Sequence, residues 1–98
     1  MPAEFARAAD GSIHIKGQLT FDSVNAALAA GQGMFARKKR LVIDLKGVEA
    51  TDSAGLALLV EWVGEAKRAG CKLKLSHVPK QALALARISE VEKLLPLR

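Results

Sequence analysis

Residues 41–59 restrict the fold more than any other segment, because an apolar strand leads there through a short polar loop into a helix. The strand Leu41–Leu45 is apolar on both faces up to Asp44, as expected for a central strand that helices cover. In α/β folds, loops at the carboxyl ends of strands are the usual place for ligands. We therefore look for function at the exposed edge that we expect to contain Asp44, Thr51, Asp52 and Ser53.

Several other segments carry strand patterns. Residues 12–16 alternate polar and apolar side chains, which indicates a half-buried strand that Gly17 ends. Residues 4–9 are a candidate partner for this strand, and residues 72–76 alternate in the same way with lysines on the outer face. Residues 94–97 are expected to close the fold as a short strand or docking segment.

The first helix is expected to begin at Thr20, which can cap it, and to continue through apolar positions spaced by three and four residues as far as Phe35. Gly31 and Gly33 disfavour its second half, because glycine costs about 1 kcal/mol relative to alanine in a helix interior. Close packing against a neighbouring element would explain both glycines.

The longest helix, residues 54–69, has an apolar arc that covers more than half of its circumference. A helix on a sheet needs a stripe of about 100° or somewhat more, so the excess must face either a neighbouring helix or another molecule. The arc contains Gly55, Leu58, Leu59, Trp62, Val63, Ala66 and Ala69, extended by Leu56 and Val60. The rims of the arc are Leu56 and Val60 on one side and Leu58 and Trp62 on the other. Whether these residues are buried or exposed distinguishes the two possibilities.

With a third helix over residues 80–88, these segments predict one small α/β domain with a mixed sheet and helices mainly on one face. Half of the 98 residues are hydrophobic, which allows a packed core without disulfides or metals, and Cys71 is the single cysteine. The longest uncharged apolar stretch, Ala54–Val60, is far shorter than a bilayer requires. We therefore expect a cytoplasmic protein that does not insert directly into a membrane.

The chain is basic, with 15 Lys and Arg against 10 Asp and Glu and a formal charge of +5. This charge favours nucleic acid, anionic lipid or an acidic protein as a partner, and nucleic acid is the least supported, because tyrosine is absent and other aromatics are few. The run Arg37–Arg40 is most simply a solvated helix terminus, although contact with anionic lipid or an acidic protein remains open. Lys72 and Lys74 most simply protect an edge strand from pairing.

Ser53 has a structural and a functional interpretation. Either Ser53 or Asp52 can cap the long helix by accepting hydrogen bonds from its first amides, and capping is the simpler role. An exposed hydroxyl at this position can also be phosphorylated or contact a partner. Catalysis by Ser53 is not expected, because His14 and His77 lie in or beside other strands, and the histidines and cysteine lack the spacing of metal ligands.

Two sequence strings resemble the signature of the STAS family, which takes its name from sulfate transporters and anti-sigma factor antagonists. They are Leu41-Val-Ile-Asp-Leu45 and Thr51-Asp-Ser-Ala-Gly-Leu56, and the resemblance extends over nearly the whole chain. Within the family, the chain is most similar to the stand-alone bacterial type represented by MlaB, the accessory subunit of an ABC transporter that maintains outer-membrane lipid asymmetry. The run Gly55–Leu59 and the ending Leu95–Arg98 carry this narrower similarity.

The resemblance implies one STAS domain over residues 1–98, with a mixed sheet of four to five strands packed against three or four helices. It implies no enzymatic activity and no cofactor. It also implies that Ser53 is either a phosphoacceptor or part of the surface that grips a transporter ATPase. The expected interface comprises Thr51, Asp52, Ser53, Ala54, Gly55, Leu56, Leu58, Trp62 and Leu28, with Asp44 as structural support of the loop.

Two functions follow from this resemblance. The first is a non-catalytic accessory subunit that binds and stabilises or regulates the MlaF-like ATPase subunit of an Mla-type phospholipid-transport ABC complex. Such a subunit would lie in the cytoplasm, peripheral to the inner membrane through the complex. The alternative is an anti-sigma factor antagonist, in which an anti-sigma factor kinase phosphorylates Ser53. A small-ligand carrier is a third and less supported possibility.

Overall fold

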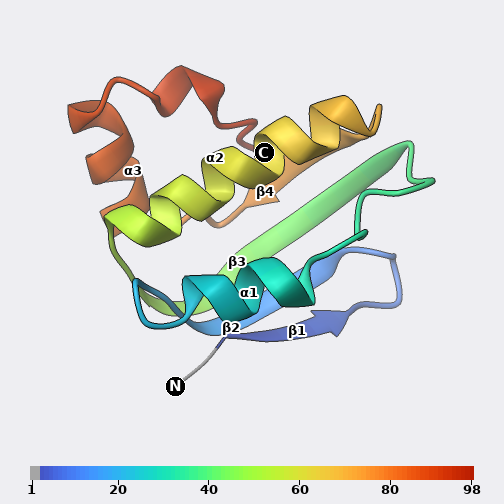
Figure 1. The fold of residues 1–98 in the computed structure, drawn as a ribbon, viewed down its shortest axis with the longest axis horizontal. Coiled ribbons are helices and arrows are strands. Elements are labelled where there is room, and N and C mark those ends of the chain that lie inside the picture. Colours follow the sequence, from blue (N-terminus) through green and yellow to red (C-terminus); the bar gives the residue numbers. More distant parts are fainter. Residues whose placement is uncertain (1–2) are drawn as a thin grey trace.

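The computed structural model describes residues 3–98, which form a four-stranded sheet and three α-helices (Figure 1). The sheet order is β1-β2-β3-β4, with β1 antiparallel to β2 and the other neighbours parallel. The mixed α/β architecture expected from the sequence is confirmed. The elements are β1 (Glu4–Arg7), β2 (Ile13–Leu19), α1 (Val24–Ala30), β3 (Arg40–Thr51), α2 (Ser53–Arg68), β4 (Lys72–Ser76), α3 (Lys80–Ile88) and the 3-10 turn η1 (Glu92–Leu94).

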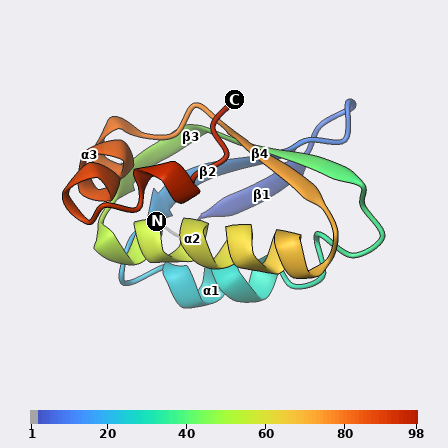
Figure 2. The same cartoon turned by 90° about the horizontal axis from the view of Figure 1, so that it is seen from above.

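The helices are distributed unequally over the two faces of the sheet. Helices α1 and α2 lie side by side on one face, and α3 lies at one end, beside the start of α2 (Figure 2). At the outer edge of β4, opposite β3, the chain returns as a short tail. Leu97 of this tail forms a single parallel bridge with Leu75. Residues 94–97 therefore dock against β4 rather than form a full fifth strand. None of the helices in residues 3–98 has the length and apolar composition needed to cross a bilayer.

The core lies between the sheet and helices α1 and α2. In β3, Leu41, Ile43 and Leu45 are buried, whereas the alternating residues point to the opposite, helix-free face. The largest fully buried side chains are Trp62, Ile15, Leu19, Ile43, Leu45, Leu59 and Leu75. The period-two pattern of the strands therefore decides which side chains meet the helices.

Two strands are longer than the sequence predicted. Gly17 does not end β2, because a positive φ of 102° and a register shift between Gly17 and Gln18 carry the strand on to Leu19. Strand β3 continues through residues 46–51, which were expected to form a loop, because they pair with β2 as far as the Leu19 and Thr51 partners. Tertiary pairing overrides the polar composition of this segment.

Helix α1 is shorter than expected. It begins at Val24 and not at Thr20, because the Ser23 hydroxyl accepts a hydrogen bond from the Thr20 amide and donates one to the Gln18 carbonyl. Gly31 packs against Trp62, as predicted for close packing. Gly33 instead has a positive φ of 75° and open space around it, so it serves a turn. The helix therefore ends at Ala30, and the chain continues through turns to β3.

Most of the apolar arc of α2 is covered by the chain itself, although Val60 is only half-buried and Ala69 is exposed. Leu56 and Leu58 are 5% exposed and Trp62 is fully buried. The Trp62 ring packs edge-on against Phe5 of β1, with 5.9 Å between the ring centroids. The part of the arc around Trp62 therefore packs against β1 and the turn after α1, and Leu56 and Leu58 expose little surface of their own.

Candidate functional site

Asp52 joins two segments at the start of α2. It is the N-cap, and its Oδ1 accepts hydrogen bonds from the amides of Ala54 and Gly55 at 3.0 and 3.1 Å. Its Oδ2 accepts a hydrogen bond from the amide of Phe21, 3.0 Å away in the segment before α1. This bond from Phe21, followed by those from the helix amides, holds the pKa of the Asp52 carboxyl below its usual range, because all three donors stabilise the charged form. Asp52 thus fixes the start of α2 to the segment before α1.

Thr51 and Gly55 support this junction from inside. The Thr51 hydroxyl is buried and donates to the carbonyl of Leu19 at 2.9 Å, while the Thr51 amide donates to Gln81 Oε1 of α3 at 3.3 Å. Gly55 packs so closely on the Leu19 carbonyl and the Thr51 hydroxyl that a Cβ atom would overlap both. These two positions of the expected interface therefore hold its backbone in place and offer little surface for contact.

Ser53 is the exposed residue of the junction. It is the first residue of α2, and within residues 3–98 its hydroxyl has no hydrogen-bond partner. Because Asp52 has taken the capping role, the Ser53 hydroxyl is available to another molecule. A group added to Ser53 would stand at the amino end of a 16-residue helix, close to the Asp52 carboxylate.

A shallow apolar groove of about 330 Å³ lies beside this junction, between α1 and α2. Phe21 stands at its side with 78% of its surface exposed. The groove is lined by Phe21, Val24, Asn25, Leu28, Ala54, Ala57, Leu58 and Glu61. We call this surface, together with Ser53, the junction face. It can bind an apolar side chain of a partner while polar groups of the partner contact Ser53.

The structure brings together only part of the residues predicted for the interface. Leu28, Ala54 and Leu58 line the groove next to Ser53, but Leu56 and Trp62 are buried in the core. Sequence reasoning missed Phe21, Val24, Asn25, Ala57 and Glu61. Recognition of Ser23 as the residue before α1 would have placed Phe21 outside the helix and therefore on the surface.

Asp44 lies away from the junction face. It is seven residues before Thr51 in β3, which corresponds to roughly 20 Å along an extended strand. Its Oδ1 lies 3.1 Å from His77 Nδ1 and accepts a hydrogen bond from the Lys46 amide at 2.9 Å. Burial raises the pKa of Asp44, but these contacts outweigh it and leave the pKa below its usual range. Asp44 thus holds the backbone at Lys46 within β3, and its expected role as structural support of the loop before α2 stays a prediction.

A serine also lies next to a histidine on the helix-free face. His14 Nε2 is 3.1 Å from Ser12 Oγ, and His14 Nδ1 is 3.9 Å from Asp44 Oδ2. The Ser12 hydroxyl, however, donates its proton to Asp10 at 2.6 Å, so His14 cannot accept that proton as a base. This hydrogen bond also lowers the pKa of Asp10. The arrangement holds the turn before β2 and does not activate a nucleophile.

Comparison with known proteins places the chain in a family. A family model described as the MlaB STAS domain matches residues 4–96, so the chain belongs to the STAS family. The family resemblance read from residues 41–56 is thereby confirmed. No match was found among curated protein sequences.

Two solved structures share the fold. A Thermotoga maritima protein, provisionally assigned as an anti-sigma factor antagonist, aligns with a TM-score of 0.73 and 12% identity over 97% of this chain and 84% of its own. The anti-sigma factor antagonist SpoIIAA, solved in its unphosphorylated form, aligns with a TM-score of 0.71 and 12% identity over 98% of this chain and 87% of its own. At this identity, the likeness establishes the STAS fold of the chain.

Proposed function

We propose that this STAS domain is a non-catalytic accessory subunit that binds and stabilises or regulates the ATPase subunit of an Mla-type phospholipid-transport ABC complex. The observation that carries the proposal is the apolar groove between α1 and α2 beside the exposed Ser53. The description of the matching family model, which names MlaB, supports this branch of the family. In this role the domain acts in the cytoplasm and stays peripheral to the inner membrane through the ATPase.

The junction face suits a protein partner better than a small ligand. The groove is open and shallow, and its lining is apolar apart from Asn25 and Glu61. A small-molecule site normally encloses most of its ligand and offers several convergent polar groups. An apolar side chain of a partner helix, surrounded by polar contacts, fits this surface.

Copurification tests this proposal. The chain is expressed with the MlaF-like ATPase of the same organism, and complex formation is measured for the wild type, Ser53→Arg and Ser89→Arg. Ser89 is also exposed but follows α3, so it is the matched control. We expect Ser53→Arg to abolish the complex and Ser89→Arg to retain it. A complex that survives Ser53→Arg unchanged contradicts the proposed contact surface.

The second candidate is an anti-sigma factor antagonist controlled by an anti-sigma factor kinase, and the free hydroxyl of Ser53 favours it specifically. A phosphate on Ser53 would place about two negative charges beside the Asp52 carboxylate and the groove. Repulsion and desolvation would then weaken an apolar contact at the junction face. Phosphorylation would therefore act as a release signal.

Mass spectrometry of protein isolated from its native cells distinguishes the two candidates. The antagonist role predicts a phosphorylated fraction on Ser53 and a copurifying kinase. The transporter role predicts a copurifying ATPase with Ser53 unmodified. Absence of phosphate on Ser53 across growth conditions removes the reason for the antagonist role.

A further inference from the structure

The helix-free side of the sheet gathers basic side chains from separate parts of the chain. In the register of β3 and β4, Arg40 is opposite Lys72, and Val42 is opposite Lys74. Paired residues point to the same face, and the buried neighbours Leu41 and Leu73 point to the helices. The turn before β3 and the tail add two more cations. We define the basic face as Lys38, Arg40, Lys72, Lys74 and Arg98.

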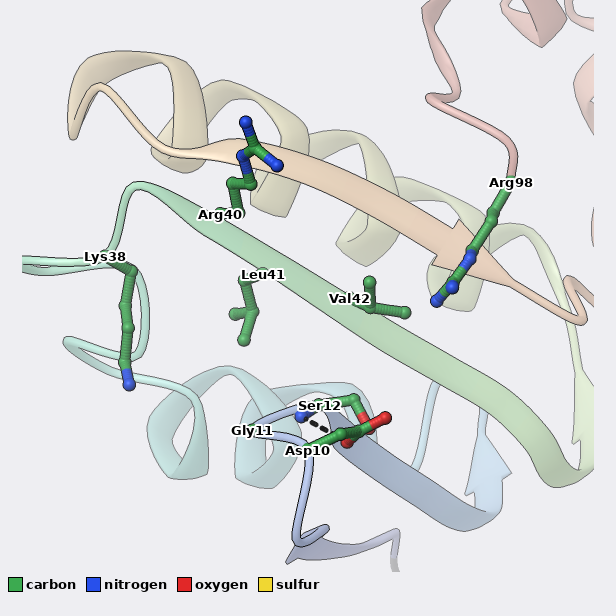
Figure 3. Close-up of a pocket in the computed structure, with 8 residues that line it drawn as sticks. All are labelled: Asp10, Gly11, Ser12, Lys38, Arg40, Leu41, Val42 and Arg98. Atoms are coloured by element: carbon green, nitrogen blue, oxygen red, sulfur yellow. Dashed lines mark hydrogen bonds between the residues drawn. The ribbon is translucent and has the colours of Figure 1, made fainter.

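The basic face contains a hollow of about 420 Å³. Lys38, Arg40 and Arg98 stand around it, and Leu41 and Val42 contribute its apolar part (Figure 3). The cations do not converge on one point, because Arg98 reaches toward Val42 while Lys38 and Arg40 extend in opposite directions (Figure 3). This arrangement suits an extended anionic surface better than a single bound anion.

The positive charge of this face is not neutralised by the chain. Within residues 3–98, none of its five cations lies within 4.0 Å of a carboxylate, whereas Lys16, Arg68 and Arg87 elsewhere form ion pairs. Asp10 is the one acidic side chain of residues 3–98 that lines the hollow, and its carboxylate accepts hydrogen bonds from the amide and hydroxyl of Ser12 without pairing with a cation of the basic face. Arg40 also begins β3 rather than ending a helix, so a helix dipole does not explain it.

Protection of the sheet edge does not explain the cluster either. Lys72 and Lys74 would suffice for that purpose, but the basic face also includes cations from β3, from the turn before it and from the tail. Nucleic acid is disfavoured, because all four aromatic residues lie elsewhere: Phe5 against Trp62, Phe21 at the groove and Phe35 in the core. An array of long cationic side chains without stacking groups is complementary to lipid phosphates.

We propose that the basic face docks directly on an anionic phospholipid membrane. The cations contact lipid phosphates at the surface, and Val42 stays at the level of the headgroups, so the domain does not insert into the bilayer. Clusters of four to eight Lys and Arg are typical of such electrostatic binding. The basic face and the junction face lie on opposite sides of the sheet, so membrane contact and partner binding are compatible (Figure 2). This proposal therefore holds whichever protein the junction face binds.

Vesicle cosedimentation tests the proposal with the purified chain alone. We expect binding to vesicles that contain about one third phosphatidylglycerol, no binding to pure phosphatidylcholine, and loss of binding as salt rises to about 0.5 M. The triple variant Arg40→Gln, Lys72→Gln, Lys74→Gln is compared with the control Lys80→Gln, Arg87→Gln, Lys93→Gln, whose cations are exposed on α3 and η1, outside the basic face. Circular dichroism verifies that both variants are folded.

The two variants lose the same net charge, so they separate a specific face from a general charge effect. Each Lys or Arg near an anionic surface strengthens binding about fivefold, so the first variant should bind roughly 100-fold more weakly while the control stays within a fewfold of the wild type. An equal loss in both variants contradicts the proposal, as does a wild type that ignores anionic vesicles at low salt. Competition by millimolar inorganic phosphate at constant ionic strength also contradicts it, because it would indicate a single-anion site.

Discussion

At the residue scale, Asp52 matters most for the junction face. Its carboxylate accepts three backbone hydrogen bonds, from Ala54 and Gly55 in α2 and from Phe21 before α1. A helix cap normally satisfies its own helix only. Asp52 also accepts a hydrogen bond from the backbone amide of Phe21. It therefore fixes the position of Phe21, which lines the groove, relative to Ser53.

Replacement of Asp52 tests this role. Asp52→Ala should lower the free energy of unfolding by about 1–2 kcal/mol at pH 7, because the amides lose their acceptor. The pKa of Asp52 is lowered by folding, so its stabilising contribution is full at neutral pH and declines as the pH falls below about 4. Urea denaturation at pH 7 and pH 3 should show a smaller difference between wild type and variant at pH 3. An undiminished difference at pH 3 contradicts this account.

Gly55 supplies a second prediction at this scale. Gly55→Ala should destabilise the chain by about 1–3 kcal/mol, because the new methyl group overlaps the Leu19 carbonyl and the Thr51 hydroxyl. Gly64→Ala in the same helix is the control. Its methyl group meets only the flexible end of Arg68, so better helix propensity should stabilise the chain by up to about 1 kcal/mol. Thermal and urea unfolding measure both variants, and equal effects of the two substitutions would disprove the packing argument.

At the element scale, the late start of α1 leaves residues before Val24 outside the helix, and one of them, Phe21, lines the groove. Because α1 begins only at Val24, Phe21 stays outside the helix and remains on the surface. The hydroxyl of Ser23 holds this turn by bonding to residues on both sides of it. An exposed aromatic side chain beside an apolar groove contributes little to folding, and it is the kind of residue that anchors a protein partner.

A substitution at Phe21 separates folding from binding. Phe21→Ser should change the free energy of unfolding by less than about 0.5 kcal/mol, because the ring is already exposed. It should weaken binding of the proposed ATPase partner at least tenfold, as expected for loss of an aromatic anchor. Urea denaturation and a pull-down measure the two effects. Unchanged partner binding would remove Phe21 from the contact surface, and strong destabilisation would show that its ring supports the core.

At the scale of the whole molecule, one sheet separates two different surfaces. Helices α1 and α2 bury the apolar alternate residues of the strands and leave the junction face between them, beside the start of α2. The opposite side of the sheet has no helix over Arg40 and its neighbours, so the polar alternate residues stay in solvent. Because α1 and α2 cover only one face of the sheet, that face forms the core and the uncovered face carries the basic side chains.

The reactivity of Cys71 shows whether the packing of α2 on the sheet is intact, because this thiol is buried in the folded chain. Burial between the end of α2 and β4 raises the pKa of its thiol, although Lys38 acts in the opposite direction. Alkylation by iodoacetamide near pH 8 should therefore be at least tenfold slower in the native chain than in urea, because the thiolate is the reactive form. Mass spectrometry of timed samples measures the two rates. Equal rates would mean that Cys71 is accessible without unfolding.

Local sequence patterns predicted most of the elements because those patterns depend on near neighbours. The alternation in residues 12–16 and 72–76 and the helical period after residue 53 correspond to β2, β4 and α2. The errors lie where distant segments decide. Residues 46–51 look like a loop but pair with β2, and Gly17 is accommodated within β2 by a register shift. Pairing of remote backbone groups outweighs local preference at these positions.

The sequence by itself determined the α/β class, the family, the single sheet and the polar junction at Thr51–Ser53, because periodicity, capping residues and the motif are local properties. Only the tertiary structure decided which residues are available to another molecule. It buried Leu56 and Trp62, exposed Phe21, removed Asp44 from the junction, and brought Arg40, Lys72 and Arg98 together. The reason is that exposure depends on what packs against a residue, and those neighbours come from segments far away in the chain.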